Sequence, residues 1–156
     1  MPFVSHLRAD QIVIAPAWHG FGATVDGLLD RLAAASLLSP AARVEAGSAV
    51  RAREHEGSTA VLDVGIGVPH ARIGMIDAPV VGLAVSSTGL YEAAPTVPIR
   101  IVALVLSPQA ALDDHLRTLA DIATTLRSSE LRTLLLRATD APTALDVLRR
   151  FTRGLP

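Results

Sequence analysis

Two near-continuous apolar segments, residues 79–87 and 98–106, most constrain what this chain can fold into. A strand with one face in water alternates apolar and polar residues, whereas a strand covered on both faces is apolar throughout. Both segments have the length of a strand, and a bilayer-spanning helix would need about 20 apolar residues. We therefore expect two central strands of a sheet that carries helices on both faces.

Helical patterns precede these strands. Thr24 offers an N-cap oxygen to a first helix, whose apolar residues recur at i, i+3, i+4 and i+7. Ser39 and Pro40 open a second helix, because serine caps well and proline fits the first turn. That helix is expected to end near His55, before Gly57. The apolar stripe of the first helix consists of Val25, Leu28, Leu29 and Leu32; the second has a shallow face with Val44, Val50 and several alanines.

The remaining segments complete an α/β pattern. Ile12–Ala15 and residues 58–68 favour strands; Gly65 and Gly67 indicate a bend or a close backbone approach, and Pro69 is expected to end the second strand. Ser107-Pro108 is expected to cap a long helix with a stripe from Leu112 to Leu126, and two shorter helices follow Ser128 and Asp140. We predict one α/β domain over residues 1–156, with a mixed, mostly buried sheet flanked by helices on both faces.

Composition excludes several classes of function. Fourteen basic residues, all arginine, stand against 15 acidic residues, and this net charge of −1 argues against a nucleic-acid or anionic-membrane partner. The absence of cysteine excludes disulfides, cysteine zinc sites and cysteine nucleophiles, and the absence of lysine excludes Schiff-base chemistry. No two histidines have metal-ligand spacing, and Gly20, Gly22 and Gly27 do not fit a dinucleotide or phosphate-loop fingerprint, so we expect neither a metal nor a cofactor. Because the N-terminus lacks a signal peptide, we expect a cytoplasmic protein without membrane insertion.

Histidines are the candidates for chemistry near neutral pH. His6, His19 and His55 lie in polar or glycine-flanked stretches that are typical of solvated surface. His70 follows a strand that ends in proline, and ligands bind at strand ends in α/β folds, although a surface turn is an equal alternative. His115 lies on the face of the long helix, where a hydrogen-bonded histidine at the edge of the core is the commoner interpretation.

Two distant segments resemble one known family. The first segment consists of Arg53-Glu54-His55-Glu56-Gly57-Ser58-Thr59 followed by Gly65-Ile66-Gly67-Val68-Pro69-His70-Ala71-Arg72, and the second surrounds His115, after the strand that ends at Leu106. Together they resemble the EIIA component of the bacterial phosphoenolpyruvate:sugar phosphotransferase system, of the fructose/mannitol and nitrogen-regulatory type. The resemblance implies a phosphotransferase component in which His70 takes a phosphoryl group from the phosphocarrier HPr and passes it to an EIIB component. It gives Arg53 and His115 the role of holding that group, and Thr59 a weaker contact with the phosphate.

This sequence departs from the family pattern at two places. Gly67 stands where the family usually has alanine, and one extra residue lies between Thr59 and Pro69. Because of these two departures, it stays open whether Thr59 contacts the phosphate. Two alternatives to sugar phosphotransfer remain: a nitrogen-regulatory protein that controls its partners according to its phosphorylation state, and an EIIA-like domain that has lost phosphotransfer through changes between Ala60 and Gly67.

Overall fold

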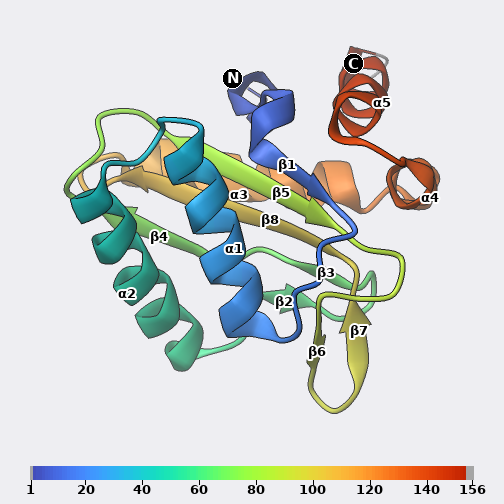
Figure 1. Ribbon diagram of the computed structural model, residues 1–156, viewed down its shortest axis with the longest axis horizontal. Coiled ribbons are helices and arrows are strands. Elements are labelled where there is room, and N and C mark those ends of the chain that lie inside the picture. Colours follow the sequence, from blue (N-terminus) through green and yellow to red (C-terminus); the bar gives the residue numbers. More distant parts are fainter. Residues whose placement is uncertain (1, 154–156) are drawn as a thin grey trace.

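The computed structural model describes residues 2–153 and has a mixed β-sheet between helices (Figure 1). The strands are β1 (Ile12–Ile14), β2 (Ala60–Val61), β3 (Ile66–Gly67), β4 (His70–Ile73), β5 (Val80–Val85), β6 (Tyr91–Ala93), β7 (Val97–Ile99) and β8 (Ile101–Pro108). The helices are α1 (Phe21–Ala34), α2 (Pro40–Glu56), α3 (Leu112–Leu126), α4 (Ser129–Arg137) and α5 (Ala141–Arg153), preceded by two short 3₁₀ helices at Phe3–His6 and Ala9–Gln11. The main sheet has the order β1-β5-β8-β3-β2, with β4 also paired to β8.

The predicted layers are confirmed. Helices α1 and α2 cover one face of the sheet and α3 lies behind the other (Figure 1). Alternate residues of β8 enter opposite cores: Leu104 and Leu106 pack with α1 and α2, whereas Ala103 and Val105 pack with α3 to α5. Strand β5 is buried along its whole length. The two central strands are therefore covered on both faces, as their apolar sequences predict.

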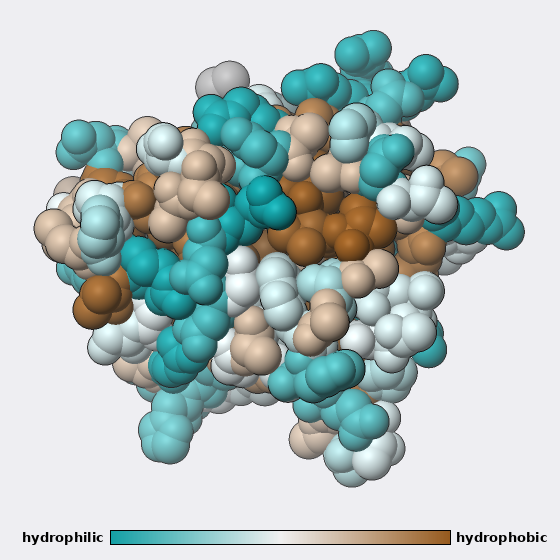
Figure 2. All heavy atoms as spheres, viewed as in Figure 1, coloured by the Kyte–Doolittle hydropathy of each residue, from teal (hydrophilic) through white to brown (hydrophobic). Residues whose placement is uncertain are grey.

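The α1–α2 face carries a mixture of hydrophilic, neutral and weakly hydrophobic residues (Figure 2). Figure 2 shows hydrophobic atoms gathered mainly over β1, beside α1, where Val13 and Ile14 are only partly buried. Within residues 2–153, every helix falls short of the length or hydropathy needed to cross a bilayer.

The first two helices match their predicted patterns except at two residues. Helix α1 begins at Phe21, so the prediction of Thr24 as its N-cap is wrong; the Thr24 hydroxyl instead donates to the carbonyl of Gly20 at 2.8 Å from within the helix. In α2 the oxygen of Ser39 accepts from the N–H of Ala42, as expected of a cap. Val44 is 71% exposed, so its assignment to the apolar face is wrong.

The predicted strand over 98–106 is divided into two. Strand β7 ends at Ile99 and belongs to the β6–β7 hairpin, which projects from the end of the sheet (Figure 1). Arg100 is exposed between β7 and β8; its N–H donates to Gly65 and its carbonyl accepts from Ser86. Apolar composition alone could not show this break, because Ile99 and Ile101 on either side of it are both buried, one in each of the two cores.

Ser107 and Pro108 do not open a helix, so that prediction is wrong. Strand β8 continues through both residues, and α3 begins at Leu112. Leu112 and Leu116 are about half exposed and do not join the buried stripe of α3. The last two helices begin as predicted, with the Ser128 oxygen accepting from Leu131 and the Asp140 carboxylate from Thr143.

Pro69 interrupts its strand without ending it, which corrects the placement of His70. Strands β3 and β4 keep one register along β8, since Ile66 lies opposite Ile101 and His70 lies opposite Val105. Pro69 has no N–H for the ladder, but its carbonyl accepts from Val105 at 3.0 Å. His70 is therefore the first residue of a paired strand, held more firmly than a residue of a loop.

Gly67 makes the close approach that its sequence context predicts. A Cβ at this position would overlap with the hydroxyl oxygen of Tyr91, whose ring packs edge-on against Phe21. That hydroxyl is buried and finds no hydrogen-bond partner among residues 2–153. The oxygen of Tyr91 thus fills the space in which an alanine methyl would lie, which accounts for glycine at this position.

We expect Gly67→Ala to lower the free energy of unfolding by about 1–3 kcal/mol, the usual cost of overpacking a core. Tyr91→Phe removes the obstructing oxygen, so the double variant is expected to recover most of this loss. Urea titrations of the wild type, both single variants and the double variant measure the coupling. Strictly additive effects would contradict the assignment of Tyr91 as the reason for glycine at this position.

Candidate functional site

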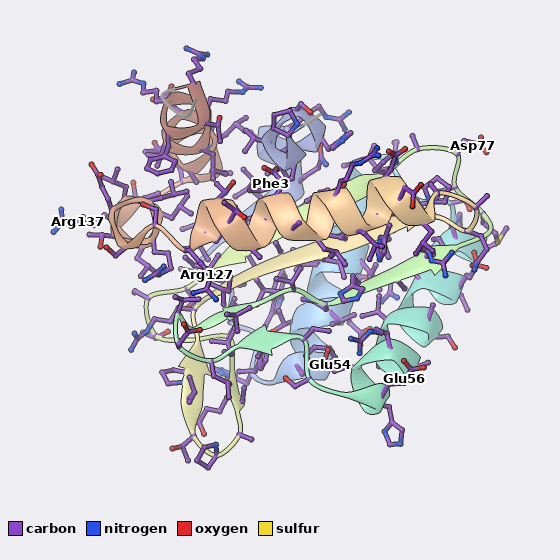
Figure 3. The ribbon with its side chains drawn as sticks, turned by 180° about the vertical axis from the view of Figure 1, so that it is seen from behind. Phe3, Glu54, Glu56, Asp77, Arg127 and Arg137 are labelled. Carbon is purple, nitrogen blue, oxygen red and sulfur yellow. The ribbon has the colours of Figure 1, made fainter. Side chains whose placement is uncertain are left out.

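A hollow of about 400 Å³ lies along the outer edge of β4, between α2 and the start of α3. In the part of the chain that the structure describes, β4 pairs with β8 alone, so its other edge is open. Figure 3 shows β4 running between these two helices. The residues that line the hollow come from three segments: Ala49, Ala52, Arg53 and Glu56 of α2; His70, Ala71 and Arg72 of β4; and Gln109 and His115 around the start of α3.

The ring of His70 is oriented by a backbone carbonyl. Its Nδ1 lies 2.7 Å from the carbonyl oxygen of Val68. Because a carbonyl only accepts, the neutral ring carries its proton on Nδ1 and leaves a lone pair on Nε2. Burial is the main cause that lowers the pKa of His70, and the positive charge of Arg53 adds to it, while the Val68 bond and Glu54 oppose them. The lowered pKa favours the neutral ring, whose Nε2 can act as a nucleophile.

His115 lies in the first turn of α3, and its ring is close to the ring of His70. The two ring centroids are 5.3 Å apart, and His115 is only 5% exposed. Burial, followed by the nearness of His70 and Arg72, lowers the pKa of His115 to about 4. Its Nδ1 lies 2.7 Å from the hydroxyl oxygen of Ser107. His115 is thus buried and hydrogen-bonded, as the core-edge alternative expects, but it also lines the hollow beside His70.

Arg53 and Glu54 lie in the last turn of α2 and fasten the chain that follows it. Nη1 of Arg53 donates to the carbonyl of Gly57 at 3.0 Å. The carboxylate of Glu54 accepts from both the N–H and the hydroxyl of Thr59, at 3.1 and 2.5 Å. Figure 3 shows Glu54 and Glu56 at this end of the helix. Both interactions fix the helix end from which the Arg53 guanidinium reaches the hollow.

Thr59 does not line the hollow. Its hydroxyl donates a hydrogen bond to the carboxylate of Glu54, so Thr59 helps to hold the end of α2 that carries Arg53. Its contact with a phosphate stays a prediction. Residues 60–67, which lie before Pro69, form the β2–β3 hairpin, whose turn is closed by bonds from Val64 and Gly65 to the carbonyl of Val61.

Arg72 and Ser107 also belong to the site, although the sequence patterns do not indicate a role for either residue. Arg72 lines the hollow, and its Nη1 donates to the carbonyl of Gln109 at 2.7 Å. Side chains two apart on a strand share one face, so a correct prediction of β4 would have placed Arg72 beside His70. The buried Ser107 was mistaken for a helix cap because a Ser-Pro pair often begins a helix.

The other three histidines lie elsewhere. His6 lines a separate hollow near Pro79 and Asp114, and His19 lines one beside Tyr91. His55 is exposed on α2. Of the five histidines, only His70 and His115 share a site.

The hollow is suited to a small tetrahedral oxyanion. Guanidinium groups approach it from α2 and β4, and an arginine binds phosphate oxygens through a fixed fork of N–H donors. Beside them stand one imidazole with a free nucleophilic nitrogen and a second neutral imidazole. This combination of groups is chemically suited to bind and stabilise a phosphoryl group.

The fold is shared with solved EIIA structures. The chain superimposes with a TM-score of 0.79 on the nitrogen regulatory protein IIA-Ntr from Neisseria meningitidis, at 22% identity, covering 94% of this chain and 98% of that one. It superimposes with a TM-score of 0.74 on the mannitol IIA of Escherichia coli, at 18% identity, covering 91% and 98%. A complex of the mannitol IIA with phosphorylated IIB from the same organism gives a TM-score of 0.71, at 17% identity over 92% and 97% of the two chains. At these identities the similarity concerns the fold.

Sequence similarity extends to curated relatives. The chain is 35% identical over 97 residues to a fructose-specific EIIA component from Haloferax volcanii, which is 62% of each chain. It is 28% identical over 103 residues to a fructose-specific EIIABC component from Bacillus subtilis, and spans 16% of that longer protein. The match thus covers less than two thirds of either relative. The model of the EIIA 2 family of the phosphoenolpyruvate-dependent sugar phosphotransferase system matches residues 6–150, and the chain belongs to this family.

Proposed function

We propose that this protein carries a phosphoryl group on Nε2 of His70, taking it from an HPr-like phosphocarrier and passing it to an EIIB component. The observation that carries the proposal is the free Nε2 of His70 in a hollow that also holds His115 and Arg53. The proposed domain spans residues 1–156, of which Met1 and residues 154–156 lie outside the described part.

In the proposed transfer, the lone pair of His70 Nε2 attacks the phosphorus of the donor phosphohistidine. A new N–P bond forms as the N–P bond of the donor breaks, and the electron pair of the broken bond returns to the donor nitrogen. The proton of His70 stays on Nδ1 throughout, and Nδ1–H donates to the carbonyl of Val68, which stabilises the positive charge of the phosphorylated ring. Arg53 and Arg72 offset the charge of the phosphoryl oxygens.

Sugar phosphotransfer is favoured over a purely regulatory role by the 35% identity to a fructose-specific EIIA component. The mannitol IIA with a similar fold forms a complex with phosphorylated IIB, which supports an EIIB component as the acceptor here. The presence of both histidines and Arg53 in one hollow argues against loss of phosphotransfer, because the residues that line this hollow lie outside the changed segment from Ala60 to Gly67.

Purified enzyme I, HPr and phosphoenolpyruvate test the proposal. We expect the protein to become phosphorylated and to pass the group to a fructose-type EIIB faster than to a mannitol-type EIIB. Phosphorylation without transfer to either EIIB would favour the regulatory alternative. No phosphorylation from HPr would contradict the proposed function.

Arg53→Gln is expected to slow phosphorylation by roughly 10- to 100-fold, since a hydrogen bond to a charged group contributes about 1.5–3 kcal/mol. It should also raise the pKa of His70, because it removes a positive charge that disfavours the imidazolium. Arg53→Lys keeps the charge and so the pKa, but it loses the fork and should still be slow. Stopped-flow phosphorylation and an NMR titration of the His70 ring measure the two effects.

Arg51→Gln is the matched control, because Arg51 bonds Asp26 at 2.8 Å on the α1 side and does not line the hollow. Arg72 cannot serve as such a control, although its sequence position suggests it, since it lines the hollow beside His115. A normal rate and an unmoved His70 pKa in Arg53→Gln would make Arg53 a solvated residue without a role in transfer.

A further inference from the structure

Ser107 is a buried polar residue that the proposed transfer does not yet use. The residues of β8 that face α3 are apolar at Ile101, Ala103 and Val105, and Ser107 continues this series with a hydroxyl. Ser107 is 1% exposed, and its oxygen lies 2.7 Å from Nδ1 of His115. This buried bond joins the strand to the helix directly behind the hollow.

The two histidines of the hollow have partners of different chemistry. Nδ1 of His70 contacts a carbonyl, which can only accept, so that ring keeps its proton on Nδ1. Nδ1 of His115 contacts a hydroxyl, which can donate or accept. The direction of the Ser107 bond therefore decides which nitrogen of the neutral His115 ring carries the proton.

We propose that Ser107 is a positioning residue that donates its O–H to Nδ1 of His115 and so keeps the His115 proton on Nε2. This inference rests on the proposed function and deepens it. Nε2 is the ring nitrogen that Ser107 does not contact, and with its proton it is a donor for the oxygens of a phosphoryl group on His70. The two rings then hold complementary tautomers, one with a nucleophilic Nε2 and the other with a donating Nε2–H.

The opposite bond direction would work against transfer. If Nδ1–H of His115 donated to Ser107, its Nε2 would present a lone pair toward the phosphoryl oxygens. The lone pair of His115 Nε2 and the phosphoryl oxygens are all acceptors, so no hydrogen bond could form between them. In a partly buried hollow, a missing hydrogen bond is costly. Because His115 is neutral near pH 7, it has one proton to place, and Ser107 selects the useful position.

Nitrogen-15 NMR of histidine-labelled protein tests the tautomer directly, with or without phosphotransfer. We expect wild-type His115 to show the Nε2–H tautomer alone and Ser107→Ala to show an average of both. Ser107→Thr keeps the hydroxyl and is expected to keep the wild-type signal. A wild-type ring protonated on Nδ1, or an unchanged signal in Ser107→Ala, would overturn the proposal even where the protein is phosphorylated normally.

Transfer rates provide the second readout. Ser107→Ala is expected to slow donation of the phosphoryl group about 3- to 10-fold, the range for one neutral hydrogen bond, and to have no effect when His115 is already alanine. Ser86→Ala is the matched control, because Ser86 is also buried, at 4% exposed, and its hydroxyl is hydrogen-bonded to Thr88 and not to a histidine. Equal slowing of Ser107→Ala in both backgrounds would overturn the role through His115. A wild type that takes no phosphate would refute the proposed function, and the tautomer spectra would still decide the role of Ser107.

Discussion

Replacing His70 by alanine is expected to abolish phosphorylation of this protein completely. His70 has a free ring nitrogen in the hollow and a carbonyl that holds its other nitrogen, and His115 has neither an exposed ring nor a fixed acceptor on Nδ1. No second nucleophile can therefore replace His70. Incubation with phosphoenolpyruvate, enzyme I and HPr, followed by intact mass measurement, should show one added phosphate in the wild type and none in the variant.

The exposed His55 offers a matched control, because His55→Ala removes an imidazole from α2 outside the hollow. It should accept one phosphate at the wild-type rate. Full labelling of His70→Ala would show that another residue is the acceptor, and the transfer scheme would then be wrong.

His115→Ala is expected to slow donation of the phosphoryl group to EIIB by about 10²- to 10³-fold. Loss of one preorganised donor to a developing charge typically costs about 2.7–4 kcal/mol of transition-state stabilisation. Uptake should still reach completion in a long incubation, since His70 keeps its free Nε2. Single-turnover transfer from the pre-phosphorylated variant to EIIB measures the effect.

His115→Gln provides the comparison, because its amide can restore an N–H donor without an imidazole. It should transfer faster than His115→Ala. Urea titrations separate this effect from stability, since both variants alter a residue that is 5% exposed. A wild-type donation rate in His115→Ala would leave His115 with a structural role only.

The layers of the fold follow from the sequence because burial on both faces imposes a readable pattern. The continuous apolar residues of β5 and β8 predict a sheet with two covered faces, and the stripe from Val25 to Leu32 predicts the face of α1. The sequence predictions are wrong at places where strand pairing, and not the local residue pattern, determines the structure. Ser107 and Pro108 have the residues of a helix start, yet pairing with β4 extends β8 through them. Pro69 has the residue type of a strand end, yet the register with β8 is preserved across it.

The site could be predicted only in part for the same reason. His70, His115 and Arg53 belong to motifs that the sequence displays, and the structure brings them to one hollow. Arg72 and Ser107 enter it through the pairing of β4 with β8, which places Arg72 opposite Ser107. That register depends on contacts between residues about 35 positions apart, and no local pattern encodes it.

In the proposed function, the phosphoryl group is carried on Nε2 of His70. Phosphorylated protein labelled with nitrogen-15 in histidine tests it, because coupling between phosphorus and a ring nitrogen identifies the bonded atom. The free Nε2 and the Val68 contact of Nδ1 predict coupling to Nε2 of His70 and a proton retained on its Nδ1. Coupling to Nδ1 of His70, or to a nitrogen of any other histidine, would contradict the account.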